Sequence, residues 1–310
     1  DRAPGEFYQL DMEMSYATQE DVFNVIEPVI YNTFKEFSDK TISNTPFTRI
    51  AYKEAMVKYG TDKPDLRNPL YIIDLSDFFN KCTFKPFINR TVRAIKVKGH
   101  MSKGFHEKML KYATSIGMGG LGYLEVQEDL SYKGPIDKFI PDDLKKELLD
   151  LAGLEKEDTI FFIADNEKRA TELAGQIRTE LGKRLDLIKK DVFEFCWIVD
   201  FPMFELDEHD KLQFSHNPFS MPQGGLDALT NQNPLDILAY QYDLVCNGVE
   251  LSSGAVRNHD INIMIKAFEM AGYTEEEVKS KFGALYTAFQ FGAPPHAGIA
   301  PGFDRMLMLL

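Results

Sequence analysis

The chain has 310 residues, of which 44% are hydrophobic, and it carries 35 Lys/Arg against 48 Asp/Glu for a formal net charge of -13. This length and apolar content allow one large domain or two of ordinary size. The acidic charge argues against a broad surface for DNA or other nucleic acid, and no apolar run approaches the ~20 residues of a membrane helix. Since the first residues also lack the pattern of a signal peptide, we expect a soluble, cytoplasmic protein that contacts neither membrane nor DNA.

The first predicted element is a half-buried antiparallel strand at residues 7–16. Apolar and polar residues alternate strictly along FYQLDMEMSY, which is typical of a strand with one buried face. The polar face carries Gln9, Asp11 and Glu13. We expect this face to line a cavity together with other polar strands.

Thr18 is the predicted N-cap of a helix whose apolar residues recur at helical spacing. The turn-rich stretch YGTDKPDLRNP at 59–69 follows as a predicted ordered loop. From 68 to 188 short strands and amphipathic helices alternate, which indicates an inserted α+β module. Residues 1–67 and 189–310 would then form the two parts of the surrounding domain.

Asn247-Gly248 is the dipeptide preferred in a two-residue type I′ hairpin. In such a hairpin Asp243 faces Ser252, and Asp243 shares a sheet face with Glu250 at a diagonal distance of ~7–8 Å between backbones. Two converging carboxylates suit Mg²⁺, which takes one or two carboxylates plus phosphates and water. A solvated polar face is the alternative interpretation of this pair.

Arg305 lies near the start of a predicted apolar helix opened by APGFD. Free N–H groups at a helix start favour an anion, so a phosphate is the predicted partner of this arginine. Pairing with Asp304 or a distant carboxylate is the alternative.

Two further stretches are weaker signals. Residues 93–111, with six Lys/Arg against Glu107, could form a local nucleic-acid patch, although a solvated helix and strand face is the better interpretation. GMGGLG at 117–122 precedes a strand and lacks the Lys-Ser/Thr of a phosphate loop, so it is predicted to be a turn.

Several stretches, in order along the chain, resemble the bacterial-type aspartyl-tRNA synthetases of class II: GEFYQLDMEMSY, YGTDKPDLRNP, WIVDFPMFE, FSHNPFS, NGVELSSGAVR and APPHAGIAPGFDRMLMLL. GFDR resembles motif 3 of that class, and GEFYQLDME resembles the second strand of motif 2. The segment 68–188 resembles the GAD domain that marks bacterial-type members. The resemblance implies an α+β fold, an antiparallel six-stranded sheet flanked by helices. It also implies a reaction in which ATP activates L-aspartate to aspartyl-adenylate, followed by transfer to tRNA(Asp), with tRNA(Asn) a further candidate.

The resemblance further implies roles for individual residues. Those for aspartate are Gln9 and Asp11 on its amino group, Arg257 on its side-chain carboxylate, and His216 beside it. Those for ATP are Phe7 stacked on adenine, Glu250, Gly302, Phe303, Asp304 and Arg305. Mg²⁺ would be held by Asp243 and Glu250, and the residues implied to be catalytic are Arg305 and Glu250.

The chain also departs from the family pattern. Strict alternation from Glu250 would put Arg257 on the wrong face, so a bulge or bend is predicted at residues 252–254. Ser252 and Ser253 stand where the family often has glycines, and Asn217 stands where it has a second histidine.

Motif 1, the first arm of motif 2 and the N-terminal anticodon-binding barrel have no counterpart in the sequence. We therefore expect the chain to be part of a longer enzyme, a homodimer at full length. Two alternatives remain. One is a noncatalytic tRNA-binding or amidotransferase-associated module with the same insert, and the other is a synthetase for asparagine or lysine.

Overall fold

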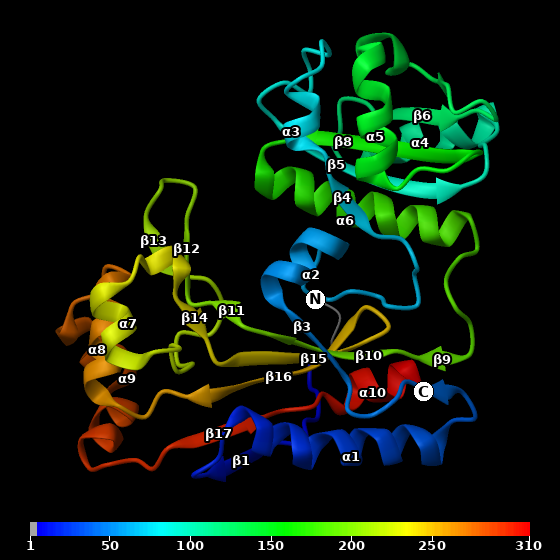
Figure 1. Ribbon diagram of the computed structural model, residues 1–310. Coiled ribbons are helices and arrows are strands. Elements are labelled where there is room, and N and C mark those ends of the chain that lie inside the picture. The colour runs from blue at the N-terminus through cyan, green and yellow to red at the C-terminus, as the bar shows by residue number, and fades with distance from the viewer. Residues whose placement is uncertain (1–4) are drawn as a thin grey trace. The chain divides into compact units, whose positions relative to one another are not determined.

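The computed structural model describes residues 5–310. The chain forms two compact units: the residues up to Lys53 together with Asp191–Leu310, and Glu54–Lys190. Each unit has its own sheet and its own buried clusters (Figure 1). The predicted segment 68–188 falls inside the second unit, and its assignment as a GAD-like insert stays a prediction.

The first unit is built on a six-stranded sheet in the order β1-β17-β16-β15-β10-β3. The strands are β1 (Met12–Ser15), β3 (Thr48–Ala51), β10 (Phe195–Val199), β15 (Gln241–Cys246), β16 (Val249–Arg257) and β17 (His296–Ile299). Neighbours are antiparallel except β10 and β3, which are parallel. The predicted α+β fold with a six-stranded sheet flanked by helices is confirmed, but the sheet is mixed rather than antiparallel because of this one parallel pair. Parallel neighbours need a long crossover, and the whole second unit lies between β3 and β10 in the sequence.

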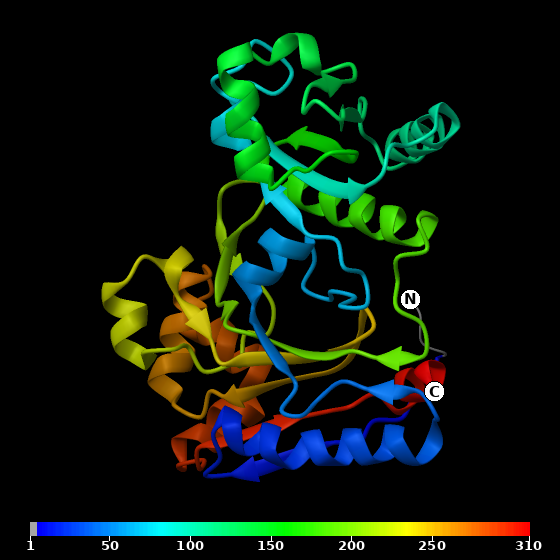
Figure 2. The ribbon, with the colours of Figure 1, turned by 45° about the vertical axis from the view of Figure 1, so that its right-hand side comes forward.

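Helix α1 (Gln19–Phe37) covers one face of this sheet, as both views show (Figures 1 and 2). Its N-cap is Thr18, as predicted, and the cap is a capping box with Asp21. Phe23 of α1 stacks on Trp197 of β10 with ring centroids 4.0 Å apart, and Tyr242 meets Phe23 edge-on. The apolar face of the sheet is thus buried against α1, and the polar face is directed to the other side.

The β15–β16 hairpin turns at Asn247 and Gly248, whose φ angles of 52° and 81° fit the predicted type I′ turn. Val245 pairs with Glu250, but Leu244 pairs with Ser252, so Leu251 is an extra residue in β16. This is the predicted bulge, placed just before residues 252–254.

The bulge changes the predicted pairing of Asp243. Asp243 pairs with Ser253 rather than with Ser252, because the extra residue shifts the register of everything beyond it. Ser252 lies opposite Leu244 and shares its side of the sheet, and it is 2% exposed.

The strand predicted at residues 7–16 is antiparallel but shorter. β1 starts at Met12, and residue 9 continues it only as a bridge to Gly302. Of the apolar side chains predicted to be buried, Met12 and Met14 pack on the core, whereas Tyr8 is 74% and Leu10 50% exposed.

The rest of the first unit lies at both ends of the sheet: a helical lobe with short ribbons at the left in Figure 1, and one two-stranded ribbon with the last helix at the right. Its helices are α7 (Gly225–Asn231), α8 (Ile261–Met270) and α9 (Glu275–Gln290), and α10 (Phe303–Leu309) follows β17. The short strands are β2 (Thr41–Ile42), β9 (Val192–Phe193), β11 (Phe201–Pro202), β12 (Phe204–Leu206), β13 (Leu212–Phe214) and β14 (Leu238–Ala239). α2 (Tyr52–Tyr59) begins the passage to the second unit.

The second unit is an α+β module around a five-stranded antiparallel sheet in the order β4-β5-β8-β6-β7. The strands are β4 (Ile72–Asp74), β5 (Thr91–Lys98), β6 (Gly122–Val126), β7 (Tyr132–Lys133) and β8 (Asp158–Asp165). The helices are α3 (Ser76–Phe79), α4 (Lys103–Ser115), α5 (Lys145–Ala152) and α6 (Glu167–Arg184). GMGGLG forms a turn between α4 and β6, as predicted.

The loop at 59–69 is fixed by a buried arginine of α6. Arg178 is 1% exposed and donates from Nε to the Leu70 carbonyl at 2.6 Å and from Nη2 to the Asn68 carbonyl at 2.8 Å. Asn68 returns a hydrogen bond to the Arg178 carbonyl. The loop is ordered because its carbonyls satisfy a guanidinium that has no access to water.

Candidate active site

Strand register places four residues of the predicted site, Asp11, Asp243, Glu250 and Arg257, on one face of the six-stranded sheet. Residues opposite each other in a ladder, and residues two apart on one strand, point to the same side. This rule gives one face with Asp11, Glu13, Gln241, Asp243, Glu250, Ser253 and Arg257. α1 and the aromatic core lie on the opposite face. The bulge at Leu251 is what brings Arg257 to the same side as Glu250.

Glu13 and Arg257 form a forked ion pair on this face. Glu13 Oε1 accepts from Arg257 Nε at 3.0 Å and from Nη2 at 2.6 Å. The two side chains come from β1 and β16, which are separated by β17. Gly298 of β17 lies between them, and a Cβ there would collide with the Glu13 carboxylate. Glu13 therefore occupies the space that a side chain at position 298 would fill.

The pair uses two of the five N–H donors of Arg257. In the part of the chain that the structure describes, the Arg257 guanidinium has no other hydrogen-bond or ion-pair partner. Its side chain is 22% exposed, so the three remaining donors form a partly desolvated, oriented group. A carboxylate is the ligand that matches this fork geometry best.

Arg305 lies at the other end of the face. Its Nη1 donates to the Glu250 carbonyl at 2.6 Å and lies 3.5 Å from Glu250 Oε1. Arg305 thus pairs with a distant carboxylate, as the alternative interpretation allowed, and not with Asp304, whose Oδ2 accepts the Tyr8 N–H at 3.0 Å. Arg305 is half-exposed and keeps donors for a further anion.

The segment around Gly302 is tied to both of its neighbours. Gly302 N–H donates to the Leu251 carbonyl at 2.8 Å, and Gln9 forms a bridge to Gly302. Phe303 N–H donates to the Tyr8 carbonyl at 2.9 Å. The structure therefore brings Gln9, Glu250 and residues 302–305 together, as the sequence interpretation requires.

The two aromatic residues of the predicted nucleotide site are accessible. Phe7 is 57% and Phe303 51% exposed, so each ring has a face open to stacking. Phe7 is followed by Tyr8, which holds both Phe303 and Asp304 through its backbone.

His216 belongs to a loop at the Arg257 end of the face. Its ring lies edge-on to Phe201 and Tyr52, and Ser215 Oγ is 2.9 Å from its Nδ1. The same loop reaches the sheet through Ser220, which forms a bridge to Arg257.

Asp243 and Glu250 have the donor chemistry that Mg²⁺ requires. Both are carboxylates, they share a face, and Asp243 is 3% exposed. Across residues 5–310 no group of three or more metal-binding side chains comes together. Mg²⁺ typically takes one or two carboxylates and completes its shell with phosphates and water. These two residues could therefore hold Mg²⁺ when the phosphates of a nucleotide are present.

The model of the class II tRNA synthetases (D, K and N) matches residues 1–310. The chain belongs to this family.

The relatives agree with the class II assignment. The chain is similar to the aspartate–tRNA(Asp/Asn) ligases of Ehrlichia chaffeensis (55% identical over 318 residues), Anaplasma phagocytophilum (54% over 318) and Rickettsia canadensis (52% over 323). Each match covers 100% of this chain and 53–54% of the relative. The chain thus spans about half the length of the curated relatives it matches, and its family is the bacterial type of class II synthetase that the motifs predicted. In the described part of the chain, no helix has the length and apolar composition needed to cross a membrane.

Two features of this class II synthetase site were not predicted from the sequence. Glu13 was placed on the polar face but had no assigned role, and Gln241 was not singled out. Gln241 is 4% exposed, and its Oε1 accepts the Asn217 N–H at 3.2 Å, which anchors the His216 loop to the face. The alternation at residues 7–16 predicted the sheet face on which Glu13 lies. Its contact with Arg257 follows only from the register of β17 with β1 and β16.

Proposed function

We propose that the full-length protein is an aspartate–tRNA ligase and that this chain supplies its catalytic unit. ATP would activate L-aspartate to aspartyl-adenylate with release of pyrophosphate, and the aspartyl group would then pass to tRNA(Asp). The observation that carries the proposal is the Glu13–Arg257 pair, a fixed guanidinium with three free donors on the same face as the nucleotide residues.

The charges of the face support this substrate. Four carboxylates, those of Asp11, Glu13, Asp243 and Glu250, are accompanied by two guanidiniums, those of Arg257 and Arg305. A face with this excess of negative charge favours cationic groups, and the amino group of aspartate and Mg²⁺ are both cations. We assign the amino group to Asp11 and Gln9, and the side-chain carboxylate to Arg257 with His216 beside it.

The proposed chemistry needs positioning rather than a covalent intermediate on the protein. Phe7 and Phe303 would hold the adenine ring, residues 302–304 would provide the surface on which the nucleotide lies, and Arg305 would bind its phosphates. As charge builds on the leaving pyrophosphate, the Arg305 guanidinium would stabilise it, with its own position set by Glu250. Mg²⁺ at Asp243 and Glu250 would neutralise phosphate charge.

The proposed site would discriminate against asparagine. A carboxylate accepts two charge-assisted hydrogen bonds from a guanidinium, whereas a carboxamide offers one neutral oxygen and turns N–H groups toward the arginine. Arg257 would therefore reject asparagine by leaving donors unsatisfied. The further proposals, a homodimer in the cytoplasm and charging of tRNA(Asn), rest on the family resemblance, and the last of them also on the relatives' names as aspartate–tRNA(Asp/Asn) ligases.

The test is amino-acid-dependent exchange of pyrophosphate into ATP. It should be run on a form of the protein extended to the length of the relatives, with aspartate, asparagine and lysine. Exchange with aspartate alone supports the proposal. Binding of tRNA without exchange for any of the three amino acids would replace it with a noncatalytic tRNA-binding module.

A further inference from the structure

Glu27 is a buried carboxylate on α1. The residue is 6% exposed, its Oε1 accepts from Trp197 Nε1 at 2.8 Å, and its Oε2 accepts from the Phe47 N–H at 3.1 Å. Both donors are neutral. Within residues 5–310, no lysine, arginine or histidine lies within ion-pair distance of Glu27. A carboxylate removed from water without a counter-charge is costly, even when both of its oxygens are hydrogen-bonded.

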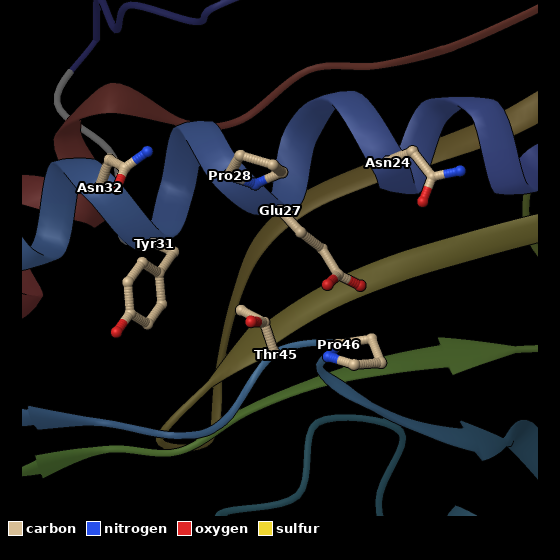
Figure 3. A pocket seen from close by; sticks show the side chains of 7 residues that line it. All are labelled: Asn24, Glu27, Pro28, Tyr31, Asn32, Thr45 and Pro46. Atoms are coloured by element: carbon tan, nitrogen blue, oxygen red, sulfur yellow. The ribbon is translucent and has the colours of Figure 1, made fainter.

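A pocket of about 290 Å³ opens beside this carboxylate. Its lining residues are Asn24, Glu27, Pro28, Tyr31, Asn32, Thr45 and Pro46. Figure 3 shows Glu27 and Tyr31 projecting from α1 toward the segment that carries Thr45 and Pro46. The lining contains no basic side chain and several oxygen acceptors from amide and hydroxyl groups.

The helix itself adds one more acceptor. Pro28 is inside α1 and has no N–H, so the Asn24 carbonyl lacks its usual helical donor. The pocket is therefore lined by a buried negative charge and polar oxygens, and Pro28 offers no N–H to the Asn24 carbonyl. These groups together require hydrogen-bond donors that carry positive charge.

We propose that this pocket binds a primary alkylammonium group, such as the end of a linear polyamine. An ammonium head has three N–H donors for the oxygens around Glu27. The methylene chain behind it would contact the rings of Pro28, Pro46 and Tyr31. The Tyr31 ring already has the Lys35 ammonium 5.9 Å from its centroid, so the ligand ammonium is assigned to the Glu27 side of the pocket. Mg²⁺ fits less well, because it requires near-octahedral oxygen ligands and keeps its own waters.

This site is separate from the candidate active site. α1 packs on the apolar face of the sheet, whereas Arg257 and Glu250 are on the polar face. The proposal therefore does not depend on the proposed ligase activity.

Trp197 provides a direct readout, because it is the only tryptophan of the chain and its indole N–H is bonded to Glu27. We expect spermidine to change the Trp197 emission of the chain in a saturable way, and the neutral analogue n-butanol to leave it unchanged. Glu27→Gln keeps an oxygen for the indole but removes the charge, so it should weaken spermidine binding by at least about tenfold. Glu36→Gln removes the same charge from an exposed position on the same helix and should bind spermidine like the wild type.

The Glu36→Gln control distinguishes binding at Glu27 from general electrostatic attraction of spermidine to an acidic protein. If Glu27→Gln and Glu36→Gln reduce binding equally, or if spermidine gives no saturable change, the proposal is wrong. Should Glu27→Gln fail to fold, Asn24→Asp gives a second test. It adds a carboxylate at the exposed rim of the pocket and should tighten spermidine binding several-fold, about threefold or more. Unchanged or weaker binding in Asn24→Asp would overturn the assignment.

Discussion

Glu13 and Arg257 are on strands that do not touch each other, and they meet across the one position of β17 that has no side chain, Gly298. The carboxylate holds one edge of the guanidinium and leaves the other edge for a ligand. Glu13 thereby fixes the orientation of the Arg257 side chain. As a positioning residue, Glu13 can raise specificity without itself contacting the substrate.

Replacing Glu13 with glutamine should weaken the hold on Arg257 without changing its size. A neutral oxygen makes a hydrogen bond about half as strong as a charged one, so we expect the KM for aspartate to rise about tenfold. The KM for ATP should change little. Aspartate and ATP titrations in the exchange reaction of the extended protein provide the measurement. Equal increases in both KM values would show that Glu13 supports the whole face rather than Arg257.

Gly298→Ala should disturb the same pair from the opposite side. The new methyl group would meet the Glu13 carboxylate and the Met12 carbonyl, so β1 or Glu13 must move. We expect a loss of about 1–3 kcal/mol in the free energy of unfolding and a fall in aspartate affinity. Chemical denaturation and the exchange assay measure the two effects.

Gly283→Ala is the matched control for that substitution. Gly283 lies in α9, and a Cβ there would meet nothing within 4 Å. Phe282 beside it has non-helical φ and ψ angles, so Gly283 lies at a kink of α9, and we expect the stability of Gly283→Ala to stay within about 1 kcal/mol of the wild type. If Gly298→Ala has the stability and the aspartate affinity of the wild type, the position of Glu13 does not depend on the absent side chain at Gly298.

Thr18→Ala removes the cap of α1 and should cost about 1 kcal/mol of stability. The Thr18 side chain and backbone N–H bond the Asp21 carboxyl and lower its pKa below the usual value. A lowered carboxyl pKa stabilises the fold at neutral pH, and this contribution is lost as the pH falls through the folded-state pKa. The difference in Tm between Thr18→Ala and wild type should therefore shrink from about pH 7 to about pH 3.

Thr33→Ala serves as the control for the cap. It deletes the same hydroxyl from the middle of α1, where alanine is favoured, and should leave Tm nearly unchanged at either pH. A constant Tm difference between Thr18→Ala and wild type at all pH values would contradict the role of Asp21.

The two units differ in charge, which bears on where tRNA would bind. Residues 54–190 carry 24 Lys/Arg and 22 Asp/Glu, so the rest of the chain carries 11 Lys/Arg and 26 Asp/Glu. Within the stretch 93–111, Arg93, Lys96 and Lys98 are paired with carboxylates of the second unit. The exposed outer face of α4 retains Lys108 and Lys111, which have no ion-pair partner among the described residues.

We expect the double substitution Lys108→Gln with Lys111→Gln to weaken tRNA binding and to lower its salt dependence by about one unit of slope or more. Exchange with aspartate in the absence of tRNA should not change. Lys146→Gln with Lys156→Gln removes equal charge from two exposed lysines that are ion-paired in the same unit. Equal losses in the two double variants would show that the effect is general electrostatics and not α4.

Local signals in the sequence predicted local structure well. The Asn247-Gly248 turn and the Thr18 cap depend on neighbours within a few residues, and both are found in the structure. The alternation predicted for residues 7–16 holds only in Met12–Ser15, where Met12 and Met14 pack on the core. The parallel pairing of β3 with β10 was missed because it joins strands separated by the whole second unit. No short-range pattern in the sequence encodes that contact.

The residues of the candidate site, like the strands of the sheet, were predicted only in part. Chemistry and resemblance selected Arg257, and a bulge had to exist if it was to share a face with Glu250. The partner of Arg257 could not be predicted, because the contact depends on three strands in register and on an absent side chain at Gly298. The role of Glu13 therefore required the register of the whole sheet.

The most direct test of the account is the preference for aspartate over asparagine in the wild type and in Arg257→Gln. We predict that kcat/KM in the exchange reaction of the extended wild-type protein favours aspartate by about 1,000-fold or more, and that Arg257→Gln reduces this preference to about tenfold or less. Arg49→Gln, at an exposed ion pair with Glu20 outside the site, should keep the wild-type preference. A variant of Arg257 that still selects aspartate as the wild type does would contradict the claim that the arginine held by Glu13 recognises the substrate carboxylate.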